Sequence, residues 1–121
     1  MDGTLTTSVG GAPRYVFIGF TPPGHDQRIS VRISDHGTER VGYGNNGTWD
    51  CLFPACEKAA CLGAKLHGNF RVISDGSDGG KARVECTLFY GDKFGFAEAK
   101  DDSLFRAGCK AFIDALNSLF V

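Results

Sequence analysis

The chain has 121 residues, of which 42% are hydrophobic, and this size and composition fit one domain with one core. Its 13 basic and 14 acidic residues give a net charge of -1, which leaves no basic excess for holding the phosphates of nucleic acids. No apolar run approaches the roughly 20 residues that cross a bilayer, and the N-terminus lacks the order of a secretory signal, so we expect a cytoplasmic protein without membrane contact.

Residues 1–13 are small, polar and glycine-rich, which predicts a flexible tail ahead of one folded domain at 14–121. The domain opens with an apolar run at 15–20 and a turn-rich connection, which predict a strand and a loop. An alternating strand follows, whose apolar face consists of Ile29, Val31 and Ile33. After a short turn, a third strand is expected to direct Val41 and Tyr43 toward the same face.

A helix is predicted after the third strand. Asp50 is a plausible N-cap, but Pro54 near the end of the first turn removes a backbone donor. We therefore expect this helix to start late or to bend, and to end near Leu62 and Gly63.

Residues 67–120 repeat this order of elements. An apolar run at 70–73 and a glycine-rich connection precede an alternating strand, whose inner face is expected to hold Ala82, Val84, Cys86 and Leu88. The third strand is expected to direct Phe94 and Phe96 inward. Asp101, Asp102 or Ser103 is expected to cap the closing helix, whose apolar residues recur at helical spacing: Leu104, Phe105, Gly108, Phe112, Leu116 and Leu119.

The two halves, 14–66 and 67–120, align with a single one-residue gap. An offset of 53 pairs Phe17 with Phe70 and Gly42 with Gly95, and an offset of 52 pairs the starts of the two helices. About fifty residues with one helix bury too little surface alone. The sequence therefore predicts an α+β fold made of two pseudo-twofold-related βββα repeats, with sheets packed on helices, in a homodimer.

The chemistry-bearing residues do not form a catalytic or metal-binding pattern. The five cysteines contain no Cys-x-x-Cys pair, so we expect reduced thiols that serve as small core residues. The three histidines, His25, His36 and His67, are scattered over predicted turns. We expect no catalytic residues, no metal and no cofactor in this chain.

Several motifs occur in an order that is typical of one family. The second half contains Phe70-Arg71-Val72, then Gly76-Ser77-Asp78, and closes with an Ala-Leu-Asn-x-Leu helix at 115–119. The first half contains a glycine–asparagine loop, Gly44-Asn45-Asn46-Gly47, before its helix. Over roughly residues 14–120 the chain resembles the C-terminal regulatory domain of 2-isopropylmalate synthases and of the similar citramalate synthases.

The resemblance implies a dimerising allosteric domain attached to a catalytic (β/α)8 barrel that condenses acetyl-CoA with a 2-oxo acid. The end-product amino acid, leucine in one family and isoleucine in the other, inhibits through this domain. The barrel and its metal-binding His-x-His pattern are absent from this sequence. The expected partners are an amino-acid effector, a second copy of the chain and such a barrel.

Charge favours the first of the two helix starts as the amino-acid site. Backbone N–H groups at a helix N-terminus suit a carboxylate, but Asp101 and Asp102 would repel an anion from the second helix. The loop before the first helix is neutral, Thr48 is able to donate a hydrogen bond, and Asp50 is able to hold the ammonium group.

The resemblance implies ligand contacts at the same loop. They fall on Gly47, Thr48, Trp49 and Asp50, with further contacts from the strand that opens the second repeat. Phe70 and Ser74 occupy the matching places on that strand. The family usually has proline or a small residue where this chain has Thr48-Trp49, so Trp49 either closes the pocket or selects a smaller ligand.

Two other classes of function compete with an amino-acid sensor. A double-stranded-RNA-binding module also combines three strands with an alanine-rich helix, but its basic cluster at the helix start is replaced here by Asp101-Asp102-Ser103. A structural or protein-inhibiting module of the same fold would keep the dimer and bind no small molecule, with Trp49 as the plug.

Overall fold

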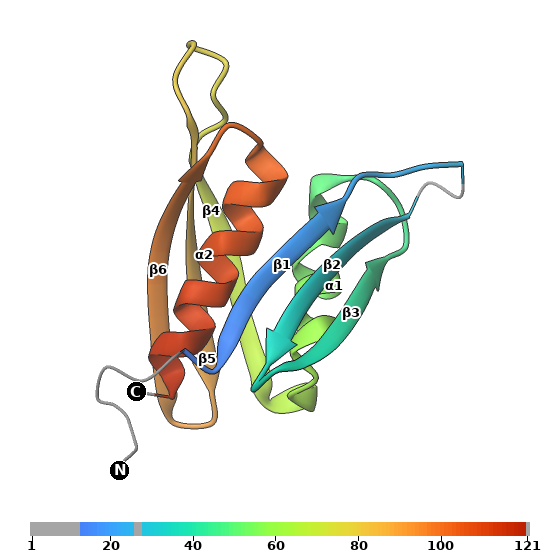
Figure 1. The fold of residues 1–121 in the computed structure, drawn as a ribbon. Coiled ribbons are helices and arrows are strands. Elements are labelled where there is room, and N and C mark those ends of the chain that lie inside the picture. The colour runs from blue at the N-terminus through green and yellow to red at the C-terminus, as the bar shows by residue number, and fades with distance from the viewer. Residues whose placement is uncertain (1–12, 26–27, 121) are drawn as a thin grey trace.

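The computed structural model describes residues 13–25 and 28–120 (Figure 1). In chain order the elements are β1 (Tyr15–Thr21), β2 (Ile29–Asp35), β3 (Thr38–Gly44), α1 (Leu52–Ala60), β4 (Leu66–Ser74), β5 (Ala82–Tyr90), β6 (Lys93–Asp101) and α2 (Leu104–Leu119). Short 3-10 turns at Trp49–Cys51 and Gly63–Lys65 precede and follow α1. The predicted βββα unit thus occurs twice. The tail prediction falls almost entirely outside the described residues.

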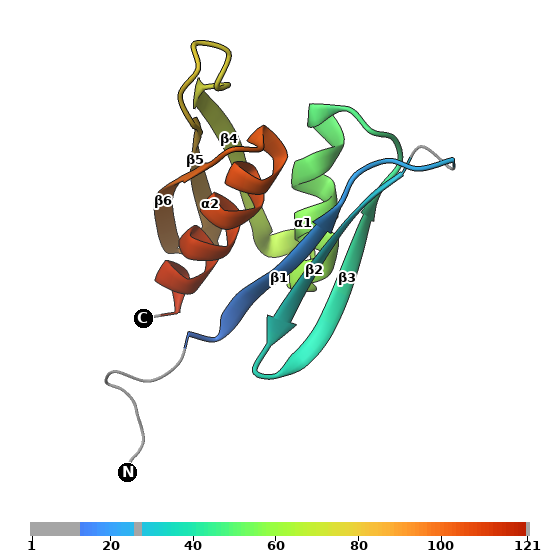
Figure 2. The same cartoon turned by 45° about the horizontal axis from the view of Figure 1, so that its top comes forward.

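The two repeats form two antiparallel sheets with the helices between them. The sheets have the strand orders β1-β2-β3 and β4-β5-β6. Helix α1 packs on β2 and β3, α2 packs on β5 and β6, and the helices contact each other. Figure 2 shows this arrangement, with α1 and α2 in the middle. Because β1 also packs on α2, the first sheet contacts the helix of the second repeat.

The second strand of each sheet has the predicted inner face. Ile29, Val31 and Ile33 on β2 are at most 1% exposed, and the four predicted inner residues of β5 are fully buried. Strict alternation places these apolar side chains against the helices. The equivalent residues Val31 and Val84 have the same environment in the two repeats.

The predicted orientation of the third strands is wrong. Val41, Tyr43, Phe94 and Phe96 are 39%, 48%, 59% and 47% exposed, because they lie on the outer faces of the sheets. Gly42 and Gly95 take buried inner positions of these strands, and the helix backbones approach them closely. A Cβ on Gly42 would overlap the carbonyl oxygen of Ala55 in α1, and one on Gly95 would overlap that of Ala115 in α2.

The helix starts differ from each other. As predicted, α1 begins late, at Leu52, so that Pro54 lies in the first turn, where no intrahelical partner for its missing N–H is needed. The prediction that Asp50 caps this helix is wrong, because the residue lies within the preceding 3-10 turn and Cys51 stands at the N-cap position without a side-chain hydrogen bond. Ser103 caps α2 as predicted, accepting from Arg106 N at 3.3 Å.

The cysteines are free thiols, as predicted. Cys56, Cys86 and Cys109 are at most 1% exposed and belong to the core between the helices and the second sheet. Cys61 is exposed, and it ends α1 in the left-handed conformation with φ of 58°. Three of the five are therefore buried in the core, and the half-buried Cys51 packs against it.

Candidate functional site

The loop before α1 is closed by its own side chains. The Asn46 Oδ1 accepts hydrogen bonds from Thr48 N at 2.9 Å, from Thr48 Oγ1 at 2.6 Å and from Cys51 Sγ at 3.2 Å. Gly47 packs against Pro23, since a Cβ there would lie 2.6 Å from the proline Cγ. Three donors therefore converge on one oxygen beside a helix start, the kind of arrangement that also receives a carboxylate.

Trp49 connects this loop to the second repeat. Its ring centroid lies 5.3 Å from that of Phe70 on β4 and 5.5 Å, edge to face, from that of Phe105 on α2. The indole packs directly on Gly108, where an added Cβ would lie 3.0 Å from Trp49 Cη2. Phe53 extends the cluster, with its ring 5.3 Å from that of Phe70.

The structure thus brings together part of the predicted site. Trp49 and Phe70 are in contact, and Gly47 and Thr48 adjoin them through the loop. Asp50 is exposed, so its carboxylate faces solvent at the same helix start. Ser74 does not join the group, because its hydroxyl accepts from Gly76 N at 3.3 Å within the turn that follows β4.

The start of α2 has a different character. Asp101 accepts from Lys110 Nζ at 2.6 Å and from Ser103 N at 3.0 Å, and Arg106 lies 3.6 Å away. Burial raises the pKa of Asp101, but these hydrogen bonds and positive charges outweigh it and hold the pKa below its ordinary value. The acidic residues predicted to repel an anion are in fact paired with cations.

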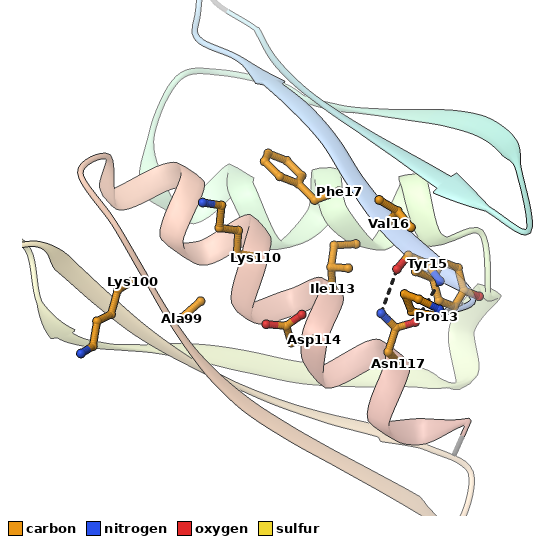
Figure 3. A pocket seen from close by; sticks show the side chains of 10 residues that line it. All are labelled: Pro13, Tyr15, Val16, Phe17, Ala99, Lys100, Lys110, Ile113, Asp114 and Asn117. Carbon is orange, nitrogen blue, oxygen red and sulfur yellow. Dashed lines mark hydrogen bonds between the residues drawn. The ribbon is translucent and has the colours of Figure 1, made fainter. Parts of the chain in front are cut away.

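An open groove, which sequence reasoning missed, lies between β1, α2 and β6 (Figure 3). It has a volume of about 430 Å³, within the usual range for small-molecule sites. Its lining residues are Pro13, Tyr15, Val16, Phe17, Ala99, Lys100, Lys110, Ile113, Asp114 and Asn117. The equivalence of Phe17 and Phe70 across the repeats marks one of its residues but does not indicate a groove.

Asn117 fixes β1 at the end of this groove. Its side-chain amide accepts a hydrogen bond from Tyr15 N and donates one to Tyr15 O, both at 2.8 Å. It thus pairs with the backbone groups at the edge of β1 as a neighbouring strand would. Arg14 lies over the rings of Tyr15 and Phe120, each at 4.8 Å. These contacts join the first strand to the end of the chain.

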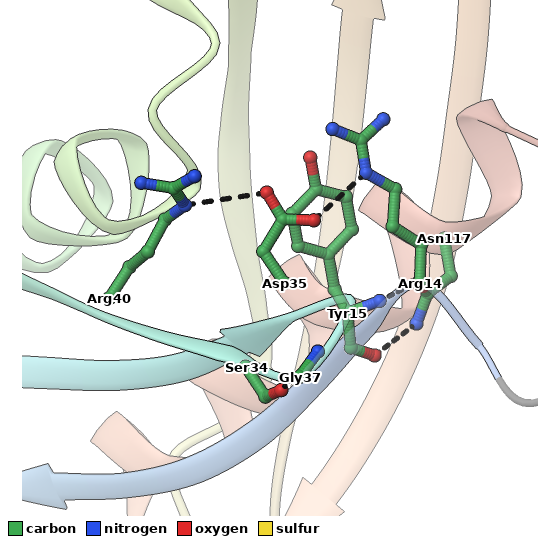
Figure 4. A network of polar contacts seen from close by, with 7 residues as sticks. All are labelled: Arg14, Tyr15, Ser34, Asp35, Gly37, Arg40 and Asn117. Atoms are coloured by element: carbon green, nitrogen blue, oxygen red, sulfur yellow. Dashed lines mark hydrogen bonds and ion pairs between the residues drawn. The ribbon is translucent and has the colours of Figure 1, made fainter.

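A buried carboxylate organises the adjoining hairpin (Figure 4). Asp35 is 8% exposed and accepts from Arg14 Nε at 3.0 Å and from Arg40 Nε at 3.4 Å. Burial raises the pKa of Asp35, but the two arginines outweigh it, so the pKa lies below its ordinary value. The ionised form is therefore the one that stabilises the fold.

We expect Asp35→Asn to destabilise the protein at neutral pH and to have less effect in acid. A hydrogen bond to a charged group contributes about 1.5–3 kcal/mol, and this is the loss expected at pH 7. Because the folded pKa is depressed, the contribution is present above the unfolded value of about 3.9 and is lost as the pH falls through the folded pKa. Urea unfolding from pH 7 to pH 2 measures it, with the exposed Glu39→Gln as control. A constant difference across this range would contradict the assignment.

Among residues 13–25 and 28–120, no group of three or more His, Cys, Asp or Glu residues is placed to hold a metal ion. In the same ranges, no helix is long and apolar enough to cross a membrane.

Comparison with known proteins gives one informative relation. No family model matches the chain. The fold defines a class, the duplicated βββα domain with helices between two sheets. Within curated proteins, the chain is 31% identical over 116 residues to 2-isopropylmalate synthase from Salinibacter ruber (strain M8). The match covers 91% of this chain and 21% of that protein, so the chain spans about a fifth of the length of its relative. The similarity to 2-isopropylmalate synthase that the motifs predicted is confirmed.

Proposed function

We propose that this chain is the regulatory part of a 2-isopropylmalate synthase-like enzyme, and that it binds a branched-chain amino acid, leucine or isoleucine, and dimerises. One observation carries the proposal: the match covers nearly all of this chain but a fifth of the synthase, and this chain folds as a complete pair of βββα repeats. A unit of this kind is suited to act on a catalytic domain rather than to catalyse. Catalysis would reside in a separate barrel.

The amino acid would bind at the start of α1. The first N–H groups of a helical turn have no partner within it, so those of Trp49 and Asp50, in the 3-10 turn that leads into α1, suit the ligand carboxylate. The exposed carboxylate of Asp50 would receive the ammonium group. The aliphatic side chain would pack on the edge of the cluster formed by Trp49 and Phe70, whose rings are partly buried.

We expect leucine or isoleucine to stabilise the folded chain. A ligand at a hundred times its dissociation constant contributes about 2.7 kcal/mol to the free energy of unfolding. Thermal melts with leucine, isoleucine and valine measure this, with D-leucine as the control for chirality. Trp49 is the chain's one tryptophan, so its fluorescence reports on the proposed site. Melts that none of these amino acids shifts would remove the sensing role.

Dimerisation is supported by the apolar outer face of the second sheet. Phe89, Phe94 and Phe96 lie there, each at least 47% exposed, and the rings of Phe89 and Phe94 are 5.3 Å apart. Exposed apolar patches of this kind mark interaction surfaces. Light scattering should give twice the chain mass, and a single-chain mass at all concentrations would remove this part of the proposal.

A second function is favoured by the packing of Trp49. Its indole touches two phenylalanine rings and sits on Gly108, so it fills space between the repeats that a ligand side chain would otherwise take. On this alternative the chain is a structural or protein-inhibiting module without a small-molecule ligand. A change at Trp49 separates the two functions.

A further inference from the structure

The loop before α1 contains a dipeptide that an amino-acid site does not require. Asn46 is followed by Gly47, and this is the one Asn-Gly pair in the sequence. In such a pair the backbone nitrogen of the glycine is able to attack the side-chain carbon of the asparagine, because the second residue has no side chain to hinder the approach. The attack expels ammonia and closes a succinimide ring, which water then opens.

The structure leaves this pair free to react. Asn46 is exposed, and the pair lies in the bend between β3 and the 3-10 turn, where no helix or strand fixes its backbone. Gly47 packs against Pro23, since an added Cβ would lie 2.6 Å from the proline Cγ. Packing therefore favours glycine directly after Asn46, the residue type that the reaction also favours.

A hydrogen bond from Thr48 N to Asn46 Oδ1, at 2.9 Å, brings the reacting atoms together. It is the bond of an Asx turn, in which the asparagine side chain folds back over the peptide that follows it. The ring that this bond closes contains both Asn46 Cγ and the Gly47 nitrogen. The turn therefore keeps the side-chain carbon near the nitrogen that attacks it.

Three donors converge on the oxygen that becomes negatively charged in the reaction. Besides Thr48 N, the Thr48 Oγ1 lies 2.6 Å and the Cys51 Sγ lies 3.2 Å from Asn46 Oδ1. When the Gly47 nitrogen adds to Cγ, this oxygen becomes an oxyanion, and hydrogen bonds already directed at it stabilise that charge. The loop is thus arranged to promote the reaction rather than to protect the amide.

We propose that Asn46 and Gly47 form a self-deamidating site, which converts the Asn46 amide into a carboxylate in the folded protein. The Gly47 nitrogen forms a bond to Asn46 Cγ and gives up its proton, and the Cγ–Nδ2 bond breaks to release ammonia. Water then adds to one of the two carbonyls of the succinimide. Opening at Cγ gives aspartate, and opening at the main-chain carbonyl gives isoaspartate, whose backbone is longer by one carbon.

The product alters the loop at the proposed amino-acid site, so its consequence rests on the proposed function. The new carboxylate receives the same three donors as an anion, and hydrogen bonds to a charged acceptor are the stronger ones. It also places a negative charge where the start of α1 would receive the carboxylate of the ligand. Deamidation should therefore weaken amino-acid binding, as a slow and irreversible switch.

Peptide mass mapping of the whole folded chain, incubated at neutral pH, tests the modification. We expect Asn46 to gain the mass that separates a carboxyl from an amide at least threefold faster than in a free peptide of residues 41–58. Thr48→Val removes one donor but suits the extended backbone, and it should slow the folded reaction at least threefold. Thr48→Ser keeps the hydroxyl and is the matched control. Asn45, which no glycine follows, is the internal reference in the same peptide.

Two results would overturn the proposal. If Asn46 reacts more slowly in the folded chain than in the free peptide, the loop protects the amide. If Thr48→Val and Thr48→Ser react at equal rates, the donors do not promote the reaction.

Calorimetric titration with leucine measures the consequence separately. Asn46→Asp should bind leucine at least tenfold more weakly than the wild-type chain. Asn45→Asp, which adds the same charge one residue away, is the matched control and should keep most of the affinity. Equal affinities of Asn46→Asp and the wild-type chain overturn the switch. A wild-type chain that binds no leucine overturns the proposed function and leaves the deamidation, which the mass measurement follows on its own.

Discussion

Replacing Gly42 by alanine is expected to destabilise the protein by about 3 kcal/mol, the upper part of the range for overpacking a core. The added Cβ would overlap the carbonyl oxygen of Ala55 and lie 2.6 Å from Ala59 N, and both atoms belong to the backbone of α1. Rotation of a side chain is unable to relieve this contact, so the helix must move away from β3. Urea unfolding followed by circular dichroism measures the loss.

A glycine in another strand offers a matched control. Gly19 lies in β1, where an added Cβ meets nothing within 4 Å and the backbone is not in the left-handed region. We expect Gly19→Ala to be neutral or stabilising by up to about 1 kcal/mol. A Gly42→Ala protein as stable as Gly19→Ala would show that the helix does not approach β3 as described. Gly95→Ala should behave like Gly42→Ala, since Gly95 has the same place against α2.

These glycines also explain where sequence reasoning succeeded and failed in the fold. The alternation in β2 and β5 predicts the buried face because each inner position carries an apolar side chain. The most buried inner positions of β3 and β6 are glycine, which has no hydrophobic signal, and the other apolar inner positions of β6 are the small Ala97 and Ala99. Tyr43 and Phe96 on the outer face have a strong signal. A rule that places apolar residues inward therefore predicts the wrong inner face for these two strands. The pairing of Gly42 with Gly95 across the repeats was visible, but its meaning depends on the helix above it.

The candidate site was predictable to a similar extent. The order of the motifs placed Trp49 and Phe70 in one site, and the two rings are in contact. The role of Asn46 as the common acceptor of the loop was not predictable, because it depends on three donors that only the folded loop brings together. The groove beside Phe17 depends on the path of β1 across α2, which no local pattern encodes.

Trp49→Val decides between the two proposed functions. We expect the variant to be less stable by about 2–3 kcal/mol, because the indole is only partly buried and valine keeps part of its packing. If Trp49 forms one wall of the amino-acid site, removal of its ring also weakens leucine binding at the start of α1 at least tenfold. Calorimetric titration with leucine measures the binding, and thermal melts measure the stability.

The matched control is Phe20→Val. The Phe20 ring also packs on Phe105, at 5.3 Å, so its loss removes a comparable aromatic contact made by a residue of β1 rather than of the loop. This variant should lose similar stability and keep its leucine affinity. The opposite pattern, in which the wild-type chain binds no leucine and Trp49→Val gains binding, would show that the indole is a plug. Its removal then leaves an apolar cavity beside Phe70 and Gly108, and the chain is a module whose effector pocket is filled by its own tryptophan.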